Sequence, residues 1–210
     1  MATNKVLFID TLTTGMSPER CSIYRLGGIY TENDVEKKRF ELRMRPFANA
    51  RVNDQSIWIS GETRSSLLVY QSEDQAFREF VAMLDEWVDV KNPNDKIYLA
   101  GYNCACLDMP FLREWFRRNG NERFRDYFHV QIIDVMSLAA FALMASRSKM
   151  PDFHLETTAR FLEVVPRETD VYDCLAKAKT GLDIYRKLEK RFGLAECLDS
   201  TEVETTYKNF

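Results

Sequence analysis

Residues Lys5–Gly15, KVLFIDTLTTG, carry the strongest structural signal in the chain. The first six, Lys5–Asp10, form a nearly continuous apolar run that ends in an acid. An apolar run without alternation is typical of a strand that is buried on both faces. The segment therefore predicts a buried strand with Asp10 at its carboxyl end.

Further strands and then helices are predicted on either side of a turn-rich passage, Pro46–Arg64. Residues Ser72–Gln75 resemble a capping box, which predicts that a helix begins there. The β-rich segments are Cys21–Thr31, Lys37–Arg45 and Lys96–Ala100, and the helical ones are Ser72–Val88, Asp108–Asn119, Val135–Arg147, His154–Glu163 and Tyr172–Phe192. This order predicts one α/β domain over residues 1–193, followed by a polar C-terminal tail, 194–210.

The composition is that of an ordinary globular protein and excludes several other classes. Of 210 residues, 45% are apolar and 29% are charged, and the net charge is −3, so the chain has no overall basic bias that would point to nucleic acid. We expect no membrane span, because no stretch approaches the roughly 20 apolar residues that one needs. No secretory segment is apparent, and five irregularly spaced cysteines favour a reducing, cytoplasmic location. Cys104-x-Cys106 lacks the usual zinc spacing and is interpreted as two small buried thiols.

Three collinear motifs resemble those of the DnaQ-like 3′–5′ exonucleases of the DEDDh type. Phe8–Gly15 is similar to the first, F-x-D-x-E-T-T-G, and Gly101-Tyr102-Asn103 with Leu107–Leu112 is similar to the second, G-[HY]-N…F-D-x-x-F-L. Tyr172–Ala178 is similar to the third, H-D-A-L-x-D-A, and Ile133-Asp134 stands where the family has a strand end. The resemblance implies a ribonuclease H-like α/β fold, in which a mixed sheet of about five strands is flanked by helices.

In that family four acidic side chains hold two divalent ions about 4 Å apart, and a histidine activates the attacking water. Mg²⁺ and Mn²⁺ are therefore the cofactors that the resemblance implies. Of the motif positions, this sequence keeps Asp10 and Asp108, but the glutamate is Leu12, the histidine is Tyr172 and the last aspartate is Lys177. A related branch uses tyrosine as the base, but one residue closer to its aspartate, so that Tyr172 does not match it.

These departures change the charge of the predicted site. Four carboxylates carry about −4 and need metal ions between them, whereas the four residues at these positions sum to −1. We expect the metal site to be lost and Lys177 to reach Asp10, Asp108 or both. Asp108 could alternatively serve only as the N-cap of its helix, and Tyr172 is expected to contribute a hydrogen-bonded hydroxyl rather than a base.

Residues Thr11, Tyr102, Asn103, Arg113 and Arg117 are the candidates for contacting nucleic acid. Arg113 and Arg117 belong to an arginine-rich segment, Asp108–Phe128, that is interleaved with aromatic residues. Arginines can bind phosphates while aromatic rings stack on bases. The favoured alternative is an amphipathic helix with its arginines in water and its rings in the core.

The favoured function is that of a catalytically inactive exonuclease-fold protein, a pseudoenzyme that binds or regulates nucleic acid. Its expected partner is the 3′ end of single-stranded nucleic acid, or a nucleotide. Two alternatives stay open: a protein-interaction or assembly component, and an active metal-dependent exonuclease with an atypical site. In size and motif style the chain is also similar to phage- and prophage-borne exonuclease-like proteins.

Overall fold

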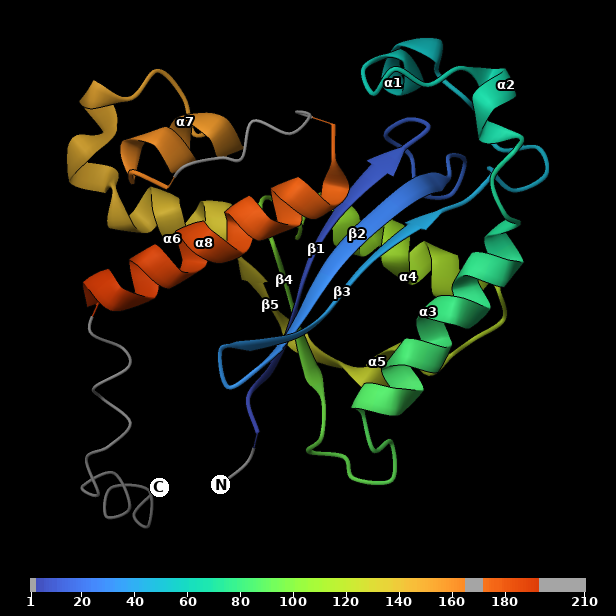
Figure 1. Ribbon diagram of the computed structural model, residues 1–210, viewed down its shortest axis with the longest axis horizontal. Helices are drawn as coiled ribbons and strands as arrows, with labels where there is room; N and C mark the ends of the chain where they lie inside the picture. Colours follow the sequence, from blue (N-terminus) through green and yellow to red (C-terminus); the bar gives the residue numbers. More distant parts are fainter. Residues whose placement is uncertain (1–2, 165–171, 193–210) are drawn as a thin grey trace.

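The computed structural model describes residues 3–164 and 172–192 (Figure 1). The predicted tail, 194–210, lies outside these residues, as does Cys197. Of the two thiols predicted to be buried, Cys104 is buried, whereas the prediction is wrong for Cys106, which is exposed in the loop before α4 (Asp108–Arg118). No helix in the described ranges combines the length and apolar character needed to cross a membrane.

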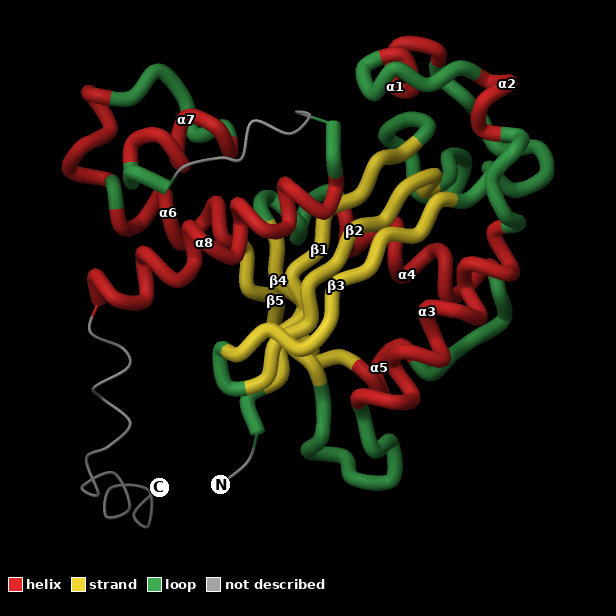
Figure 2. The backbone as a smooth tube through the Cα atoms, viewed as in Figure 1, coloured by secondary structure: helices red, strands yellow, loops and turns green. Residues whose placement is uncertain are grey.

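A single mixed sheet forms the centre of the molecule (Figure 2). Strand β1 pairs antiparallel with β2 and parallel with β4, and the order across the sheet is β3-β2-β1-β4-β5. The strands are β1 (Lys5–Thr13), β2 (Ile23–Glu32), β3 (Val35–Arg43), β4 (Ile97–Gly101) and β5 (Phe128–Asp134). The predicted α/β fold with a mixed five-stranded sheet is confirmed.

Helices cover both faces of this sheet, which explains the apolar run in β1. Leu7 and Ile9 point into a core beneath α3 (Glu73–Trp87), α4 (Asp108–Arg118) and α5 (Phe124–Tyr127). Val6 and Phe8 point to the opposite face, into a core beneath α6 (Val135–Ala142), α7 (Leu155–Phe161) and α8 (Cys174–Phe192). Because successive strand residues alternate between faces, a strand covered on both sides needs apolar residues throughout.

Sequence patterns placed the boundaries of the five predicted helices within two residues, with one exception. Helix α3 begins where the capping box predicted, since the Ser72 hydroxyl accepts a hydrogen bond from the Gln75 amide. The predicted helix Val135–Arg147 is wrong in its second half, because α6 ends at Ala142 and a 3₁₀ helix, Met144–Lys149, follows. Helix α8 begins at Cys174 rather than Tyr172.

The passage Pro46–Arg64 contains more structure than its turn-rich sequence predicted. Two short helices, α1 (Asp54–Trp58) and α2 (Arg64–Leu67), form a small lobe at the upper right of Figure 1. Ile57 and Leu67 pack against Tyr24 and Leu12 on the sheet. The lobe is therefore fixed to the carboxyl end of β1.

Helix α8 lies against β2 at a point where only glycine fits. A Cβ on Gly27 would stand 2.5 Å from the Leu175 amide nitrogen and 2.8 Å from the Cys174 Cβ, inside van der Waals contact. Gly27 is also the antiparallel partner of Asp10. The missing side chain therefore brings the first turn of α8 close to the end of β1.

Candidate functional site

Two aspartates meet where β1 ends and α4 begins. Asp108 is the first residue of α4, and its Oδ1 accepts hydrogen bonds from the Thr11 amide at 2.8 Å and the Thr11 hydroxyl at 2.6 Å. Leu107 holds the N-cap position, and it makes no side-chain cap bond. The alternative of Asp108 as an N-cap is therefore wrong, because its carboxyl group joins α4 to β1.

Burial shifts both aspartates towards their protonated forms. It raises the pKa of Asp108 to about 8, helped by the negative charge of Asp10 and opposed by the hydrogen bonds from Thr11. It raises the pKa of Asp10 to about 6, opposed by the positive charge of Lys177 and a hydrogen bond with Cys174. The Asp10 Oδ2 is buried and has no hydrogen-bond partner among the described residues. At neutral pH the two side chains therefore share about one proton.

Leu12 stands on the same side of β1 as Asp10, two residues further along. Its side chain packs against Tyr24, Ile57 and Leu67 at the base of the α1–α2 lobe. Its partner across the strand pair is Arg25. The position that carries a glutamate in the motif is thus part of a small apolar cluster.

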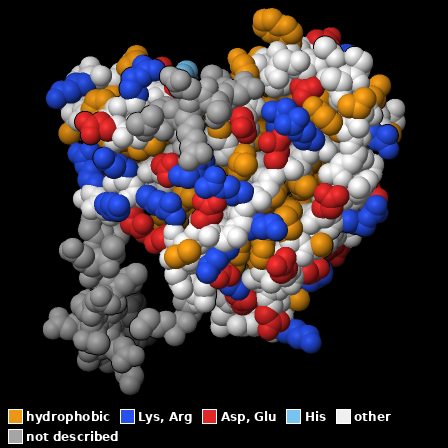
Figure 3. Space-filling view, viewed as in Figure 1, with side chains coloured by type: hydrophobic (Ala, Val, Ile, Leu, Met, Phe, Trp, Pro, Cys, Tyr) orange, Lys and Arg blue, Asp and Glu red, His pale blue; other side chains and the backbone are white. Residues whose placement is uncertain are grey.

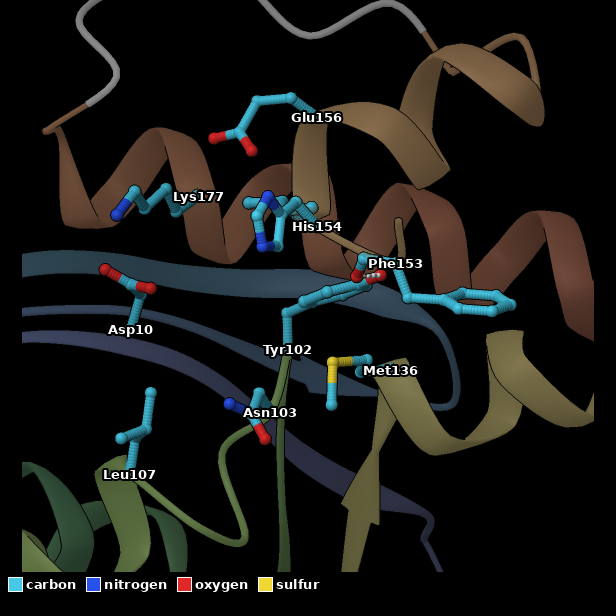
Figure 4. Close-up of a pocket in the computed structure, with 10 residues that line it drawn as sticks. Asp10, Tyr102, Asn103, Leu107, Met136, Phe153, His154, Glu156 and Lys177 are labelled. Atoms are coloured by element: carbon cyan, nitrogen blue, oxygen red, sulfur yellow. Dashed lines mark hydrogen bonds between the residues drawn. The ribbon is translucent and has the colours of Figure 1, made fainter. Parts of the chain in front are cut away.

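Lys177 of α8 lines the same cavity as Asp10 (Figure 4). The cavity measures about 300 Å³, and Lys177 and Glu156 enter it from the helices while Asp10 enters from the sheet. Among the described residues, no ion pair within 4.0 Å joins Lys177 to Asp10 or Asp108. The direct contact expected from the sequence is therefore absent, and Lys177 acts on Asp10 at longer range, through its charge.

The other cavity walls come from the loop between β4 and α4, from α6, and from the segment Phe153–Glu156, which leads into the first turn of α7. The Tyr102 hydroxyl donates to the Phe153 carbonyl at 2.7 Å and lies 2.6 Å from the Thr158 hydroxyl. Asn103 adopts a left-handed conformation, with φ of 61°. The remaining lining residues are Leu107, Met136, Phe153, His154, Leu155 and Glu156.

The sequence predicted Tyr102 and Asn103 at this site but missed the segment from Phe153 to Glu156. Only folding brings that segment opposite Asp10, and its residues match none of the three motifs. His154 also lines the cavity, and its side chain is 80% exposed. Tyr172 contributes its backbone carbonyl, which accepts from Arg25 Nη1 at 3.1 Å, and its side chain is not among those that line the cavity.

Comparison with known proteins gives the family. A family model for exonucleases, RNase_T, matches residues 7–179, most of the chain. The chain belongs to this exonuclease family. The resemblance to DnaQ-like exonucleases and their ribonuclease H-like fold is confirmed. No protein of curated function matches the chain in sequence.

Solved exonucleases share the fold at low sequence identity. Exonuclease I of E. coli, solved in complex with a dT13 oligonucleotide, superposes with a TM-score of 0.72 at 17% identity, over 93% of this chain and 43% of that one. Exonuclease I of Methylocaldum szegediense gives a TM-score of 0.69 at 19% identity, over 90% of this chain and 41% of that one. This chain therefore spans less than half the length of these exonucleases.

The residues present do not fit the pair of metal ions that the exonuclease family implies. Hard divalent cations need oxygen ligands, but Leu12 supplies none and Lys177 brings a positive charge into the cavity. Within the described parts of the chain, no group of three or more His, Cys, Asp or Glu side chains is placed to hold a metal ion.

The two arginines predicted to contact nucleic acid lie on α4, where internal partners engage them. Arg117 pairs with Glu114 at 2.6 Å, and the Arg113 guanidinium lies 5.7 Å from the centre of the Phe124 ring. The neighbouring rings of Trp115, Phe116, Tyr127 and Phe128 are buried in the core. The alternative of an amphipathic helix is therefore correct for these aromatic rings, which lie in the core. Contact of Arg113 and Arg117 with nucleic acid stays a prediction.

Proposed function

We propose that this exonuclease-family chain binds the 3′ end of single-stranded nucleic acid without cleaving it. The observation that carries the proposal is the pair of residues at the lost ligand positions, Leu12 within an apolar cluster and Lys177 at the cavity. Two-metal hydrolysis requires carboxylates there to hold the ions against both the attacking and the leaving oxygens. Neither side chain can be turned into an oxygen ligand by a change of rotamer.

A proton and an ammonium group replace part of the charge that metal ions would supply. Asp108 has a pKa near 8 and stays largely protonated at pH 7, while Lys177 lowers the pKa of Asp10 from across the cavity. The acidic groups can therefore coexist without divalent ions. An ammonium group at this position would also repel an approaching cation.

The cavity keeps features that suit the end of a nucleic-acid strand. Its walls combine flat or apolar side chains, such as Tyr102, Leu107 and Phe153, with the Asn103 amide and the Lys177 ammonium. Aromatic and apolar walls can hold a base, and an ammonium can bind a phosphate. The structures of E. coli exonuclease I in complex with dT13 and dA16 oligonucleotides support a single strand as the ligand class.

The proposal is tested by measuring binding and cleavage on the same oligonucleotide. Fluorescence anisotropy of a single-stranded oligonucleotide with a free 3′ end should show binding that weakens as salt rises. We expect Lys177→Met to weaken binding, whereas Lys187→Met, an exposed position on the same helix, should not. Incubation with Mn²⁺ or Mg²⁺ should leave the strand intact on a denaturing gel. Stepwise 3′ shortening that disappears in Asp10→Asn would show an active enzyme instead.

A further inference from the structure

A second concave surface, which we call the arginine groove, lies beyond the end of β1. It is formed by the loop Thr14–Cys21, the segment Ala50–Asn53 and Arg64, and has a volume of about 590 Å³. Three of the residues that line it are arginines, Arg20, Arg51 and Arg64. No aspartate or glutamate is among the described residues that line it. A chain with net charge −3 thus carries a locally positive concave surface here.

Hydrogen bonds between the two segments hold the floor of the groove in place. The buried Thr14 hydroxyl donates to the Arg51 carbonyl at 2.7 Å, and the Thr14 carbonyl accepts from the Asn53 amide at 2.8 Å. The Arg51 amide donates to the Arg20 carbonyl at 2.6 Å. The backbone that carries the arginines is therefore ordered before any ligand binds, which lowers the entropy cost of binding.

Two of the three guanidinium groups of this groove have no partner in the described part of the molecule that a ligand would have to displace. The side chains of Arg20 and Arg51 are exposed and make no ion pair or hydrogen bond with any described residue. Arg64 pairs with Asp54, and its Nη2 donates to the Val52 carbonyl at 2.5 Å. The side chains of Arg64 and Asp54 are more than half exposed, at 59% and 75%, and an exposed pair of this kind adds little stability and can exchange its partner. Arg117 differs in its partner, because Glu114 is only 11% exposed and accepts two hydrogen bonds from the Arg117 guanidinium.

The groove lies close enough to the cavity for one strand to occupy both. Asp10 lines the cavity and Thr14 lines the groove. The two residues are four positions apart at the end of β1, which corresponds to about 13 Å in an extended strand. Two exposed apolar side chains lie nearby in the chain: Met16, which lines the groove, and Trp58, the last residue of α1, each 76% exposed. Asp54 and Trp58 are four residues apart on α1, so that Trp58 shares the helix face that pairs with Arg64.

We propose that Arg20, Arg51 and Arg64 bind the phosphates of a single-stranded nucleic acid upstream of its 3′ end. Guanidinium groups bind phosphate oxygens in bidentate fashion, and Trp58 provides a surface on which a base stacks. This inference rests on the proposed function, since it assumes that the 3′ end occupies the Asp10 cavity. It adds a separate binding surface and a length requirement, because a mononucleotide cannot reach both sites.

The test compares two pairs of charge-neutralising substitutions in the full chain. Arg20→Ala with Arg51→Ala removes two groove charges, and Lys187→Ala with Lys190→Ala removes two exposed charges from the far end of α8. The probe is a fluorescein-labelled single strand of about 12 nucleotides. We expect the groove pair to weaken its binding at least about fivefold and to lower the slope of log affinity against log salt by about 1.4. The α8 pair should leave both quantities close to wild type.

The outcomes separate the groove from the cavity. If the groove pair binds the strand like wild type while Lys177→Met weakens binding, the groove proposal is overturned and the proposed function stands. If the groove pair weakens binding and Lys177→Met has no effect, the groove is supported and the cavity is not where the strand ends. If the wild-type chain binds no oligonucleotide, both proposals fail. Thermal unfolding should be unchanged in the groove pair, because neither side chain has a partner to lose.

Discussion

The identity of residue 12 decides whether the end of β1 carries a possible metal ligand or an apolar contact. Leu12 lies two residues beyond Asp10 on β1, and its side chain packs with Tyr24, Ile57 and Leu67. The substitution converts a charged position into part of the contact that fixes the α1–α2 lobe. Reversing it therefore has both a functional and a structural consequence.

We expect the triple variant Leu12→Glu, Tyr172→His, Lys177→Asp to bind divalent ions. It restores the family's carboxylates at two positions, and Mn²⁺ affinity measured by calorimetry should rise by at least about tenfold over wild type. Without metal the variant should unfold at lower temperature, because a carboxylate then replaces Leu12 in an apolar cluster. Adding Asp10→Asn to the triple variant should abolish the gain. A triple variant that binds no Mn²⁺ would contradict the assignment of these positions.

We expect the protein to become less stable as pH rises from about 5 to about 8. Burial raises the pKa of Asp108 from its ordinary value of 3.8 to about 8, so the folded state binds a proton that the unfolded state has released. Its contribution is fully present below about pH 4 and is lost as pH rises through about 8. Asp108→Asn keeps an acceptor for Thr11 but does not titrate, and it should flatten this dependence by at least about 1 kcal/mol in urea unfolding. A parallel pH profile in the variant would show that Asp108 is ionised when folded.

Three elements, β1, α4 and α8, meet to form the site. The distance between α8 and the sheet depends on a glycine at one contact and on the hydrogen bonds and ion pair of an arginine at another. Gly27 permits the close approach of α8 to β2. Arg25, opposite Leu12, reaches Glu62 at 3.3 Å and the Tyr172 carbonyl at 3.1 Å, so that it links β2 to the lobe and to the residues before α8. Packing and charge thus position α8 together.

Gly27→Ala should destabilise the fold and weaken oligonucleotide binding together. The added methyl would overlap the backbone of α8, at a cost of about 1–3 kcal/mol in urea unfolding, and would shift Lys177. Gly181→Ala is the matched control, because a Cβ there meets nothing within 4 Å. In a helix interior the control should be neutral or stabilising by up to about 1 kcal/mol. Equal effects of the two substitutions would argue against the close contact.

Arg25→Met should lower the free energy of unfolding by about 3 kcal/mol, because Glu62 then stays buried without its cation. Arg43→Met serves as the control. Arg43 pairs with Glu41 but its side chain is 49% exposed, so its loss should cost less than about 1 kcal/mol. Chemical denaturation measures both. Similar decreases in the free energy of unfolding for the two variants would show that burial does not strengthen the Arg25–Glu62 ion pair.

The molecule as a whole presents a mixed surface rather than one dominated by a single charge. Figure 3 shows Lys and Arg side chains interspersed with Asp and Glu across the visible face. Net charge therefore says little about where an anionic strand would bind. Local arrangements, such as the arginine groove, carry that information.

Deleting residues 194–210 should leave the domain as stable as the full chain. The sequence predicts a polar tail that follows the last helix, and chain ends of this kind usually contribute little to the stability of a domain. The thermal midpoint of the shortened chain should agree with that of the full chain, and unfolding should remain a single transition. A drop of several degrees would place this segment within the folded domain and move the predicted boundary.

The ribonuclease H-like fold was predictable from local patterns in Lys5–Asp10 and the three motifs. Such patterns report burial on each face of a strand and the beginning of each helix, which depend on near neighbours. The short helices α1 and α2 were not predictable in this way, because Ile57 and Leu67 stabilise them through contacts with Tyr24 in a distant strand. The end of α6 was missed because its sequence stays helix-favouring beyond Ala142.

Sequence alone established the family resemblance and the loss of two acidic positions, because residue identities at fixed spacings suffice for both. Tertiary structure decided what fills the site: that Asp108 bonds to Thr11, that Lys177 acts on Asp10 without touching it, and that Glu156 and Arg20 lie near the end of β1. The physical reason is that burial and charge interactions depend on distances through space. Those distances are set by how the helices pack on the sheet, not by separation along the chain.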